Sequence, residues 1–488
     1  MSRPSTGAGR ARRAWPAALA VLLVAFALYR DGKVNASFDS LWTLHEAWSL
    51  VREGDLDLDE YRDVIPTGDY RVDEVGGRLR STFPPGTALL AAPLAAVVDA
   101  GARALGHDPY ARLRAVPPDH ATTRLAKTLA SVLVAAAAAL WVPLGRRRGL
   151  APGGAVGLAL VFAFATPAFS LLSRGLWQHG PVVLCLTVAL WLLAVGEERP
   201  WATAVSALPL AFAFVVRPTA AIPLVAVGAA VAVRWPRRLP AWLAAAGAVL
   251  VPFVLWSRSA WGAWLPPYHA PGRLAVHDAY LEALAANLVS PARGLLVFAP
   301  VVAFAAWQPV VKVLGGWGLW LARRRLARRD GALETAVAAA CVAHWLAVSA
   351  FGHWWGGHGY GPRFMSDLLP LLLWLAVPAV AALVPAAAAE PRGPSSGRPR
   401  AASRAGRRRA ASPSAAPTSG RLRTALASAA RPAAAVLLAA AVGWGLFVNV
   451  RGARDWGPWR WHDAPVDLDR APSRVWDWHD PPFLRTEG

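Results

Sequence analysis

The sequence predicts an all-α polytopic membrane protein with about eleven transmembrane helices and a large loop directly after the first of them. Of its 488 residues, 55% are hydrophobic and only 17% are charged, whereas a soluble chain carries about a quarter charged residues. The apolar residues form blocks of roughly 17 to 25 residues, the length at which a helix crosses a bilayer. Such blocks must be helical, because lipid offers no partner to backbone N–H and C=O groups.

The basic residues indicate membrane orientation rather than nucleic-acid binding. The formal net charge is +21, but the arginines gather between apolar blocks and form no single patch. This is the pattern that the positive-inside rule expects of cytoplasmic loops. Both cysteines, Cys185 and Cys341, lie inside apolar blocks, so no disulfide framework is predicted. We therefore expect the lipid bilayer as a partner, and no nucleic acid.

The N-terminal segment orients the first helix. Arg3, Arg10, Arg12 and Arg13 precede the apolar block Trp15–Tyr29, which places the N-terminus in the cytoplasm. The block has no clear small-residue cleavage site, and many further apolar blocks follow it. An uncleaved first helix is therefore favoured over a signal peptide.

Residues 30–121 are expected to form one extracytoplasmic loop with juxtamembrane helices. Its first part, Asp31 to about Arg80, is acid-rich and too polar to cross lipid. The apolar stretch from Pro84 to Val98 is only marginally long enough to span, and a crossing there would place Arg146–Arg148 outside the cell. A juxtamembrane helix on the outer surface lets the block from about Thr122 to Leu144 carry the chain inward, which keeps these arginines in the cytoplasm.

The remaining loops then alternate consistently. The loops expected inside are Glu197–Arg199, Arg234–Arg238, Arg323–Arg329 and a Pro/Ser/Ala/Arg-rich linker at 386–430, whose composition predicts disorder. The loops expected outside are Ser173–Pro181, Ser257–Arg293, His353–Arg363 and a short Trp-rich tail at 451–488, which follows a last transmembrane helix at 431–450. Residues 1–385 form the main transmembrane domain in this interpretation.

The first loop offers a candidate catalytic carboxylate. Asp39 comes just after the exit of the first helix, where burial and neighbouring cations can set its pKa for general-base work. The competing interpretation is that Asp39 caps a helix at Leu41–Arg52, and the two roles are compatible. The alternating acids of Asp55–Asp59 lack the glycine and distal glutamate of a calcium loop. A solvated acidic turn is therefore favoured there over a metal site.

Arginines on the outer side are candidate ligands of a phosphate. Arg217-Pro218 interrupts the apolar stretch Leu208–Val227, so the chain is expected to turn there with Arg217 at the outer surface. A guanidinium suits a phosphate, although snorkelling to the interface is an equal alternative. Arg293 lies next to a helix start, which is a second potential anion site. The sequence leaves open which of the outward arginines converge on one phosphate: Arg174, Arg217, Arg258, Arg293 and Arg363.

Two of the outer loops combine tryptophan with histidine. One contains Trp177, Gln178 and His179, and the other contains His353, Trp354 and His358. Tryptophan at this level often belongs to the interfacial belt, but a belt does not need adjacent histidines. An apolar ring beside hydrogen-bonding groups suits a sugar, so these six residues are candidate sugar or acceptor ligands. His353 and His358 could instead bind a metal, but no third ligand is evident and their spacing gives no helical pair.

The order of these motifs resembles the GT-C fold membrane glycosyltransferases, especially the protein O-mannosyltransferase and aminoarabinose transferase branch. The resemblance covers the chain from the first helix to about Pro385. It rests on Phe38-Asp39-Ser40, Ala47–Val51 and Gly54-Asp55, Pro84-Pro85-Gly86, the hairpin with Arg217, Ser290–Leu296, and Trp354–Arg363 running into the Leu368–Pro370 helix. The chain departs from the larger relatives because it lacks a sizeable soluble C-terminal domain.

That resemblance implies a catalytic domain at 1–385 that takes a sugar from a polyprenyl-phosphate donor in the outer leaflet. The acceptor would be a glycan, a lipid or a protein of the cell envelope, and no nucleotide would take part. Asp39 would act as general base in an inverting displacement, with Arg217 and either Arg363 or Arg293 on the departing phosphate. A divalent metal is left open, and the sugar is not predicted. The Ala/Arg/Gly-rich composition is associated with high-GC bacteria, so a bacterial cell membrane is expected.

Other functional classes remain open from the sequence. A flippase or transporter for a lipid-linked saccharide would show internal symmetry or broken helices in matching halves, with ionisable residues near the bilayer midplane. A polysaccharide polymerase or ligase would place its large loop late in the chain. A non-catalytic scaffold is the remaining alternative.

Overall fold

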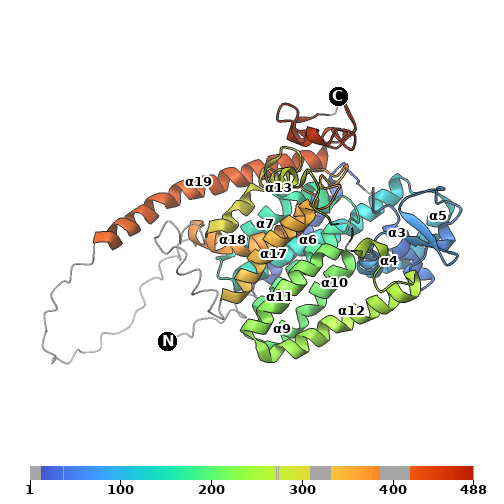
Figure 1. The fold of residues 1–488 in the computed structure, drawn as a ribbon, viewed down its shortest axis with the longest axis horizontal. Helices are drawn as coiled ribbons and strands as arrows, with labels where there is room; N and C mark the ends of the chain where they lie inside the picture. The colour runs from blue at the N-terminus through green and yellow to red at the C-terminus, as the bar shows by residue number, and fades with distance from the viewer. Residues whose placement is uncertain are drawn as a thin grey trace.

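The computed structural model describes residues 13–36, 38–270, 272, 274–307, 331–384 and 418–486. Arg3, Arg10, Arg12 and the arginine run 323–329 lie outside these residues, as do residues 385–417 of the predicted linker. Helices make up most of the described chain (Figure 1).

The first half of the chain contains the helices α2 (Trp15–Asp31), α3 (Thr43–Arg52), α4 (Gly86–Ala104), α5 (Pro109–Ala115), α6 (His120–Arg147), α7 (Pro152–Phe164), α8 (His179–Gly196), α9 (Pro200–Val205), α10 (Ala207–Val216) and α11 (Ala221–Arg234). The second half contains α12 (Leu239–Trp261), α13 (Tyr280–Val289), α14 (Leu295–Phe298), α17 (Ala332–Ser349), α18 (Leu369–Leu383), α19 (Thr418–Arg454) and α20 (Gly457–Arg460). Two strands, β1 (Val72–Val75) and β2 (Arg78–Ser81), lie between α3 and α4.

Seven helices of the described residues are long and apolar enough to cross a membrane: Gly86–Ala104, His120–Arg147, His179–Gly196, Pro236–Trp261, Ala332–Ser349, Phe364–Leu383 and Pro432–Arg454. Four shorter apolar helices, which include Pro200–Val216 and Pro218–Arg234, lie between them. The count of about eleven spans from the sequence is larger than seven, because it includes apolar segments whose helices here are shorter than 18 residues, and it stays a prediction. The chain does turn at Arg217-Pro218, as predicted: α10 ends at Val216 and α11 begins at Ala221.

The all-α prediction needs one correction, because β1 and β2 form an antiparallel hairpin inside the first loop. Val72 pairs with Ser81, and Val75 pairs with Arg78. Gly76 and Gly77 make the two-residue turn with φ of 63° and 81°, a left-handed conformation that favours glycine and suits the twist of a hairpin.

The long helix α6 defines two ends of the helical bundle. Near its start, Lys127 Nζ donates to Gly32 O over 2.6 Å, so the end of α2 lies beside the beginning of α6. At its other end, Arg147 pairs with Glu198 over 3.5 Å. The segment between α2 and α6 therefore starts and ends at one end of the bundle, which we call the loop end.

Helix α4 packs with the loop helices. Its Asp99 accepts hydrogen bonds from Trp48 Nε1 (3.3 Å) and Arg52 Nη2 (2.8 Å), both on α3. Because the loop returns to the end where it began, a crossing by α4 would need a second crossing before His120. Only the seven-residue helix α5 lies there, which is too short to span. This geometry favours the juxtamembrane placement that the sequence predicts for Pro84–Val98, although α4 has the length of a span.

The charged loops group as the sequence predicts. At the end opposite the loop end, Arg148 pairs with Glu334 (2.9 Å) and Arg234 with Glu197 (2.8 Å). At the loop end, Arg454 pairs with Asp31 over 3.2 Å, so the C-terminal tail begins beside the end of α2. Two groups of loops thus lie at the two ends of the bundle; the assignment of one end to the cytoplasm stays a prediction.

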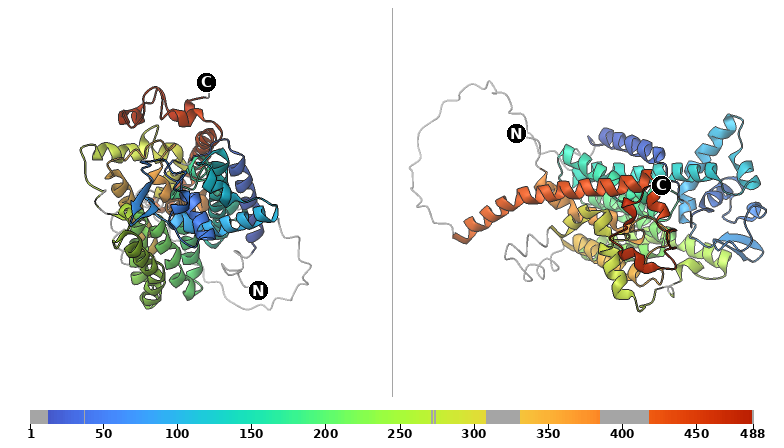
Figure 2. Two further views of the ribbon diagram at one scale, coloured as in Figure 1. Left: turned by 90° about the vertical axis from the view of Figure 1, so that its right-hand side faces the viewer. Right: turned by 90° about the horizontal axis from the view of Figure 1, so that it is seen from above.

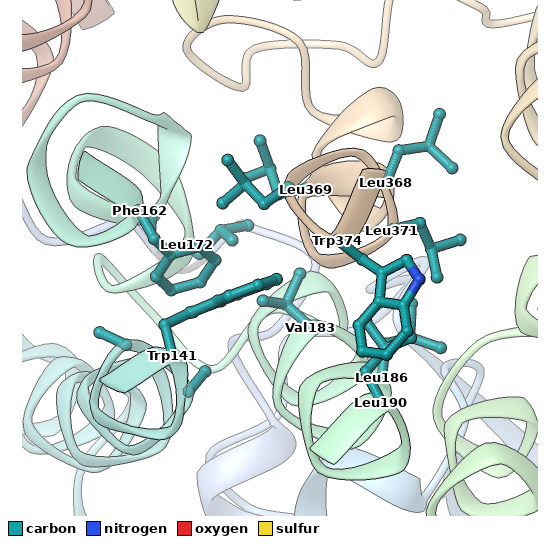
Figure 3. Close-up of a cluster of buried hydrophobic side chains, with 14 of the residues drawn as sticks. Trp141, Phe162, Leu172, Val183, Leu186, Leu190, Leu368, Leu369, Leu371 and Trp374 are labelled. Atoms are coloured by element: carbon teal, nitrogen blue, oxygen red, sulfur yellow. The ribbon is translucent and has the colours of Figure 1, made fainter. Parts of the chain in front are cut away.

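The centre of the bundle is mainly apolar, and Trp374 at its edge also contacts the guanidinium of Arg148, 3.9 Å from its ring. Trp141 of α6 lies beside Phe162 of α7, and Leu186 and Leu190 of α8 lie beside Trp374 of α18 (Figure 3). In contrast, only 17% of the apolar window of α12 is buried, and the same share of that of α19, which is typical of helices that present side chains to lipid. Figure 2 shows α19 running along the outside of the bundle. It begins at Thr418, so residues 418–430, assigned to a disordered linker from the sequence, are helical.

Candidate active site

Asp39 pairs with a distant arginine and does not cap a helix. The predicted helix is present at Thr43–Arg52, but its N-cap is Trp42 and no side chain caps it. Asp39 Oδ2 instead forms an ion pair with Arg363 Nη2, and its Oδ1 accepts a hydrogen bond from Tyr70 over 2.9 Å. The capping interpretation is therefore wrong. Asp39 joins the first loop to the loop His353–Arg363, hereafter the 353–363 loop.

The electrostatic surroundings keep Asp39 ionised. Burial alone would raise the pKa of this carboxyl, but the charge and hydrogen bond of Arg363, with the hydroxyl of Tyr70, hold the pKa below its ordinary value. The side chain of Asp39 is 26% exposed and that of Arg363 is 12% exposed, so the pair is reachable from one side. At neutral pH it presents a carboxylate and a guanidinium side by side.

The pair lines an open surface pocket at the loop end. Trp177 and Gln178 form one wall of this pocket, and Phe83 and Pro84, just before α4, form another. The hydroxyl-bearing residues Ser40, Thr43 and Thr87 complete it. The structure thus brings together Asp39, Arg363, Trp177 and Gln178, which the sequence singled out from three separate loops.

Trp177 positions Arg363 and offers no open ring face. Its indole Nε1 donates to Ala36 O over 2.9 Å, and the guanidinium of Arg363 lies 4.2 Å above its ring. The side chain is only 2% exposed. The cation–π contact therefore occupies the face that a sugar would need, and Trp177 supports the pocket from behind.

Arg217 points into the protein. It is 5% exposed, its Nε lies 3.0 Å from Asp367 Oδ2, and its Nη1 donates to Gln178 Oε1 over 3.2 Å. His179 Nδ1 lies 2.7 Å from Asp367 Oδ1. The snorkelling interpretation is therefore wrong, and Arg217 stands behind Gln178 and not in the pocket itself.

Asp367 is the residue that sequence reasoning missed. It is 2% exposed, and its two carboxylate oxygens lie within 3.0 Å of His179 and Arg217. The available signal was an acid at the start of an otherwise apolar span, Phe364–Leu383. Such a residue is costly in a membrane protein and usually faces a partner or a cavity.

Arg293 holds backbone and does not face the pocket. It is 1% exposed and donates to the carbonyl oxygens of Trp355, Gly357 (2.6 Å) and Ala292 (3.0 Å). The helix after it, α14, has only four residues. The predicted anion site at this position is therefore wrong: Arg293 orders the 353–363 loop.

The other two arginines are also placed elsewhere. Arg174 is fully buried and donates to Tyr29 O over 2.7 Å. Arg258 donates to Gly262 O and lies over the ring of Trp264. Of the five outward arginines, Arg363 lines the pocket and Arg217 lies one residue behind it.

The C-terminal tail (residues 455–486) covers the aromatic and histidine residues of the 353–363 loop. Trp354 is 3% exposed and packs with Trp461 and Val475, so it is a core residue and not a sugar platform. His353 Nε2 lies 2.9 Å from Asp469 Oδ1. His358 lies close to three tail carboxylates: Asp463, Asp467 and Asp469. Neither histidine lines the pocket of Asp39, although the ring of His358 lies 6.4 Å from that of Phe38.

The acidic turn Asp55–Asp59 serves the hairpin. Asp57 forms an ion pair with Arg78, and Asp55 lies 3.6 Å from the same guanidinium. Asp59 Oδ1 accepts from Leu79 N over 2.7 Å. These acids hold β2 against the loop. Asp57 is only 3% exposed, so the prediction of a solvated turn is wrong for this residue.

Comparisons of this chain with protein-family models, with curated proteins and with solved structures find no match. The likeness to GT-C glycosyltransferases rests on motif order alone, and the function is therefore argued from the geometry of the site.

Proposed function

We propose that this chain is a membrane glycosyltransferase that moves a sugar from a polyprenyl-phosphate donor to a hydroxyl of a glycan, lipid or protein acceptor. The observation that carries the proposal is the ion pair of Asp39 and Arg363 in an open pocket at the loop end. Such a displacement needs a base for the acceptor hydroxyl and a cation for the leaving phosphate. The pocket supplies one of each, side by side.

The two groups would exchange partners when the donor binds. A donor phosphate competes with Asp39 for Arg363, because guanidinium binds phosphate through paired hydrogen bonds. Once Arg363 turns to the phosphate, the main influence that lowers the pKa of Asp39 weakens, and the carboxylate becomes a stronger base. The acceptor oxygen then attacks the anomeric carbon, its proton passes to Asp39, and the phosphate leaves with the electron pair of the broken C–O bond.

Gln178 is the proposed polar ligand of the donor. Its Oε1 accepts from Arg217, which fixes the orientation of the amide. Its Nε2 is buried and has no hydrogen-bond partner among the described residues, while the residue lines the pocket. A buried amide donor costs free energy unless it is satisfied, and a sugar hydroxyl or a phosphate oxygen would satisfy it.

The apolar helices support a lipid-linked donor. Seven of the described helices are long and apolar enough to cross a membrane, and Phe83 and Pro84 of the pocket wall lead directly into α4. A polyprenyl chain can then remain in the bilayer while its phosphate reaches Arg363. On this proposal the pocket opens on the extracytoplasmic side of a bacterial cell membrane.

The decisive test is transfer by the Asp39→Asn variant in nanodiscs, assayed with a panel of polyprenyl-phosphate pentoses and hexoses. Loss of a general base is expected to lower the rate by about 10²- to 10⁴-fold, while insertion and thermal stability stay close to the wild type. Asp63→Asn is the matched control, because Asp63 lies exposed in the same loop. Unchanged transfer by Asp39→Asn would refute the assignment.

One observation favours a second candidate, a transporter of lipid-linked saccharides. Asp367, Arg217 and His179 form a buried ionisable network at the edge of two apolar helices, and such groups often mark transport pathways in membranes. Purified protein in liposomes that flips a fluorescent lipid-linked saccharide, yet transfers no sugar from any donor, would favour this function over the first.

A further inference from the structure

The C-terminal tail and the 353–363 loop meet at a group of three potential metal ligands. His358 Nε2 lies 3.4 Å from Asp467 Oδ2 and 3.7 Å from Asp469 Oδ2. One ligand atom from each of these residues lies within 4.8 Å of the other two. The histidine and the acids come from segments more than a hundred positions apart in the chain, so local sequence does not explain their convergence.

A second observation points to a ligand between them. His358 Nε2 is buried and makes no hydrogen bond within the described chain, although two carboxylates lie beside it. Atoms bound to one cation at about 2.0–2.2 Å in tetrahedral geometry lie roughly 3.3–3.6 Å apart. The 3.4 Å separation from Asp467 fits that spacing, and the 3.7 Å separation from Asp469 is slightly longer. Both exceed the usual hydrogen-bond length of about 2.7–3.2 Å.

The ligand side chains also have partners on the atoms that do not face the proposed ion, as is usual for metal ligands. His358 Nδ1 lies 3.3 Å from Asp463 Oδ1, so a carboxylate lies beside the ring nitrogen that faces away from the proposed ion. Asp469 uses its other oxygen, Oδ1, to accept from Trp355 Nε1 over 2.7 Å. Asp467 Oδ1 accepts from the backbone N–H of Asp469 over 2.8 Å. Carboxylate–histidine–metal arrangements of this kind orient the ligands of natural sites.

We propose that His358, Asp467 and Asp469 bind a divalent transition metal, Zn²⁺ or Mn²⁺, that fastens the tail to the 353–363 loop. One imidazole nitrogen with two carboxylate oxygens suits these ions, whereas Mg²⁺ and Ca²⁺ favour oxygen ligands alone. Three protein ligands leave room for water. The role is structural, because these residues do not line the pocket of Asp39.

The metal would act on the pocket through the loop it restrains. Arg363 lies five positions after His358, and its Nη1 donates to Gly356 O over 3.2 Å within the same loop. Fixing His358 therefore limits the positions that Arg363 can reach. This inference stands without the proposed function, since binding of the metal can be measured in the absence of any donor or acceptor.

The test uses the full-length protein in detergent, purified with a tag that contains no histidine and stripped with EDTA. Titration calorimetry with ZnCl₂ or MnCl₂ is expected to give about one ion per chain, and thermal stability is expected to rise with the bound ion. His358→Ala, and the double variant Asp467→Asn/Asp469→Asn, are expected to abolish this binding. Asp463→Asn, which removes only the group that orients His358, is expected to weaken it about 10- to 100-fold.

His479→Ala is the matched control, because His479 is an exposed histidine of the same tail and should leave binding unchanged. Pulsed electron paramagnetic resonance of the Mn²⁺-loaded wild type gives a readout that needs no variant: a directly bound imidazole nitrogen is expected. The proposal is overturned if no ion binds, if His358→Ala binds as the wild type does, or if the spectrum contains oxygen ligands only.

Discussion

The two ends of the bundle use arginine in different ways. At the end opposite the first loop, Arg234 and Arg148 pair with glutamates that are 47% and 39% exposed. At the loop end, Arg217 pairs with Asp367 where both side chains are almost completely buried, and Arg293 is enclosed by backbone carbonyls. Arg217 and Arg293 therefore lie inside the protein, whereas Arg234 and Arg148 pair with acids that reach the surface. The exposed pair of Arg454 and Asp31 shows that the loop end also has a surface ion pair.

Exposed and buried arginine ion pairs are expected to contribute differently to stability. Exposed ion pairs contribute about 0.2–1 kcal/mol, so the ion pairs of the opposite end add little to stability. Breaking a buried ion pair costs about 3–5 kcal/mol, because the remaining charged group is left without a counter-charge and without water. The arginines of the loop end are therefore part of the structure that supports the pocket of Asp39.

The largest effect is expected at Asp367. Asp367→Leu leaves Arg217 buried without a counter-charge, so the free energy of unfolding should fall by about 3–5 kcal/mol. The thermal unfolding midpoint in detergent, followed by size-exclusion chromatography, measures this loss. The double variant Asp367→Leu/Arg217→Leu should recover much of it, since apolar residues often replace a buried pair without cost. A double variant as unstable as the single one would show that the pair is not the source of the effect.

Removal of the Arg293 side chain should come next. Arg293→Ala removes the donor of the part-buried carbonyl oxygens of Trp355 and Gly357, so the free energy of unfolding should fall by about 1–3 kcal/mol in total. Hydrogen exchange is expected to rise in the 353–363 loop and to stay unchanged in β1 and β2. Exchange in Arg293→Lys should lie between that of the wild type and that of Arg293→Ala, because an ammonium lacks the planar set of N–H donors with which a guanidinium reaches several carbonyl oxygens. Equal exchange in all three proteins would contradict the role of Arg293.

A smaller, pH-dependent effect is expected from His45 in the first loop. Burial lowers the pKa of His45 from 6.5 to about 3. Above pH 6.5 the residue is neutral in both states. Below it, only the unfolded state binds a proton, so the free energy of unfolding falls by up to about 1.4 kcal/mol per pH unit until the pH nears the folded pKa. At pH 5 the loss amounts to roughly 2 kcal/mol.

The variant His45→Phe should lose this pH dependence, because phenylalanine cannot take up a proton. Unfolding midpoints at pH 7.5 and pH 5 measure it, with hydrogen exchange of α3 as the local readout. His107→Ala is the control, because His107 is exposed in the same loop and should leave the acid sensitivity intact. Equal acid sensitivity in His45→Phe and wild type would contradict the assignment.

The sequence predicted features that depend on neighbouring residues and missed features that depend on distant ones. The turn at Arg217-Pro218 follows from one proline in an apolar stretch, whereas the membrane side of each loop, inferred from its charge, stays a prediction. The partner of Asp39 lies 324 positions away, so local pattern favoured a helix cap instead. Asp367 was missed because one acid hardly changes the hydropathy of Phe364–Leu383. Trp354 was misassigned because its burial depends on the distant tail.

The smallest effect is expected at the opposite end of the bundle, where it tests the comparison directly. Glu197→Gln removes one partner of Arg234, and Glu197 itself is 47% exposed, so the unfolding free energy should change by less than about 1 kcal/mol. The change should shrink further in 0.5 M salt, because ions screen exposed pairs. Thermal unfolding of Glu197→Gln beside Asp367→Leu, at low and high salt, measures both ends in one experiment. A loss at Glu197 as large as that at Asp367 would mean that the two ends do not differ in the way that burial implies.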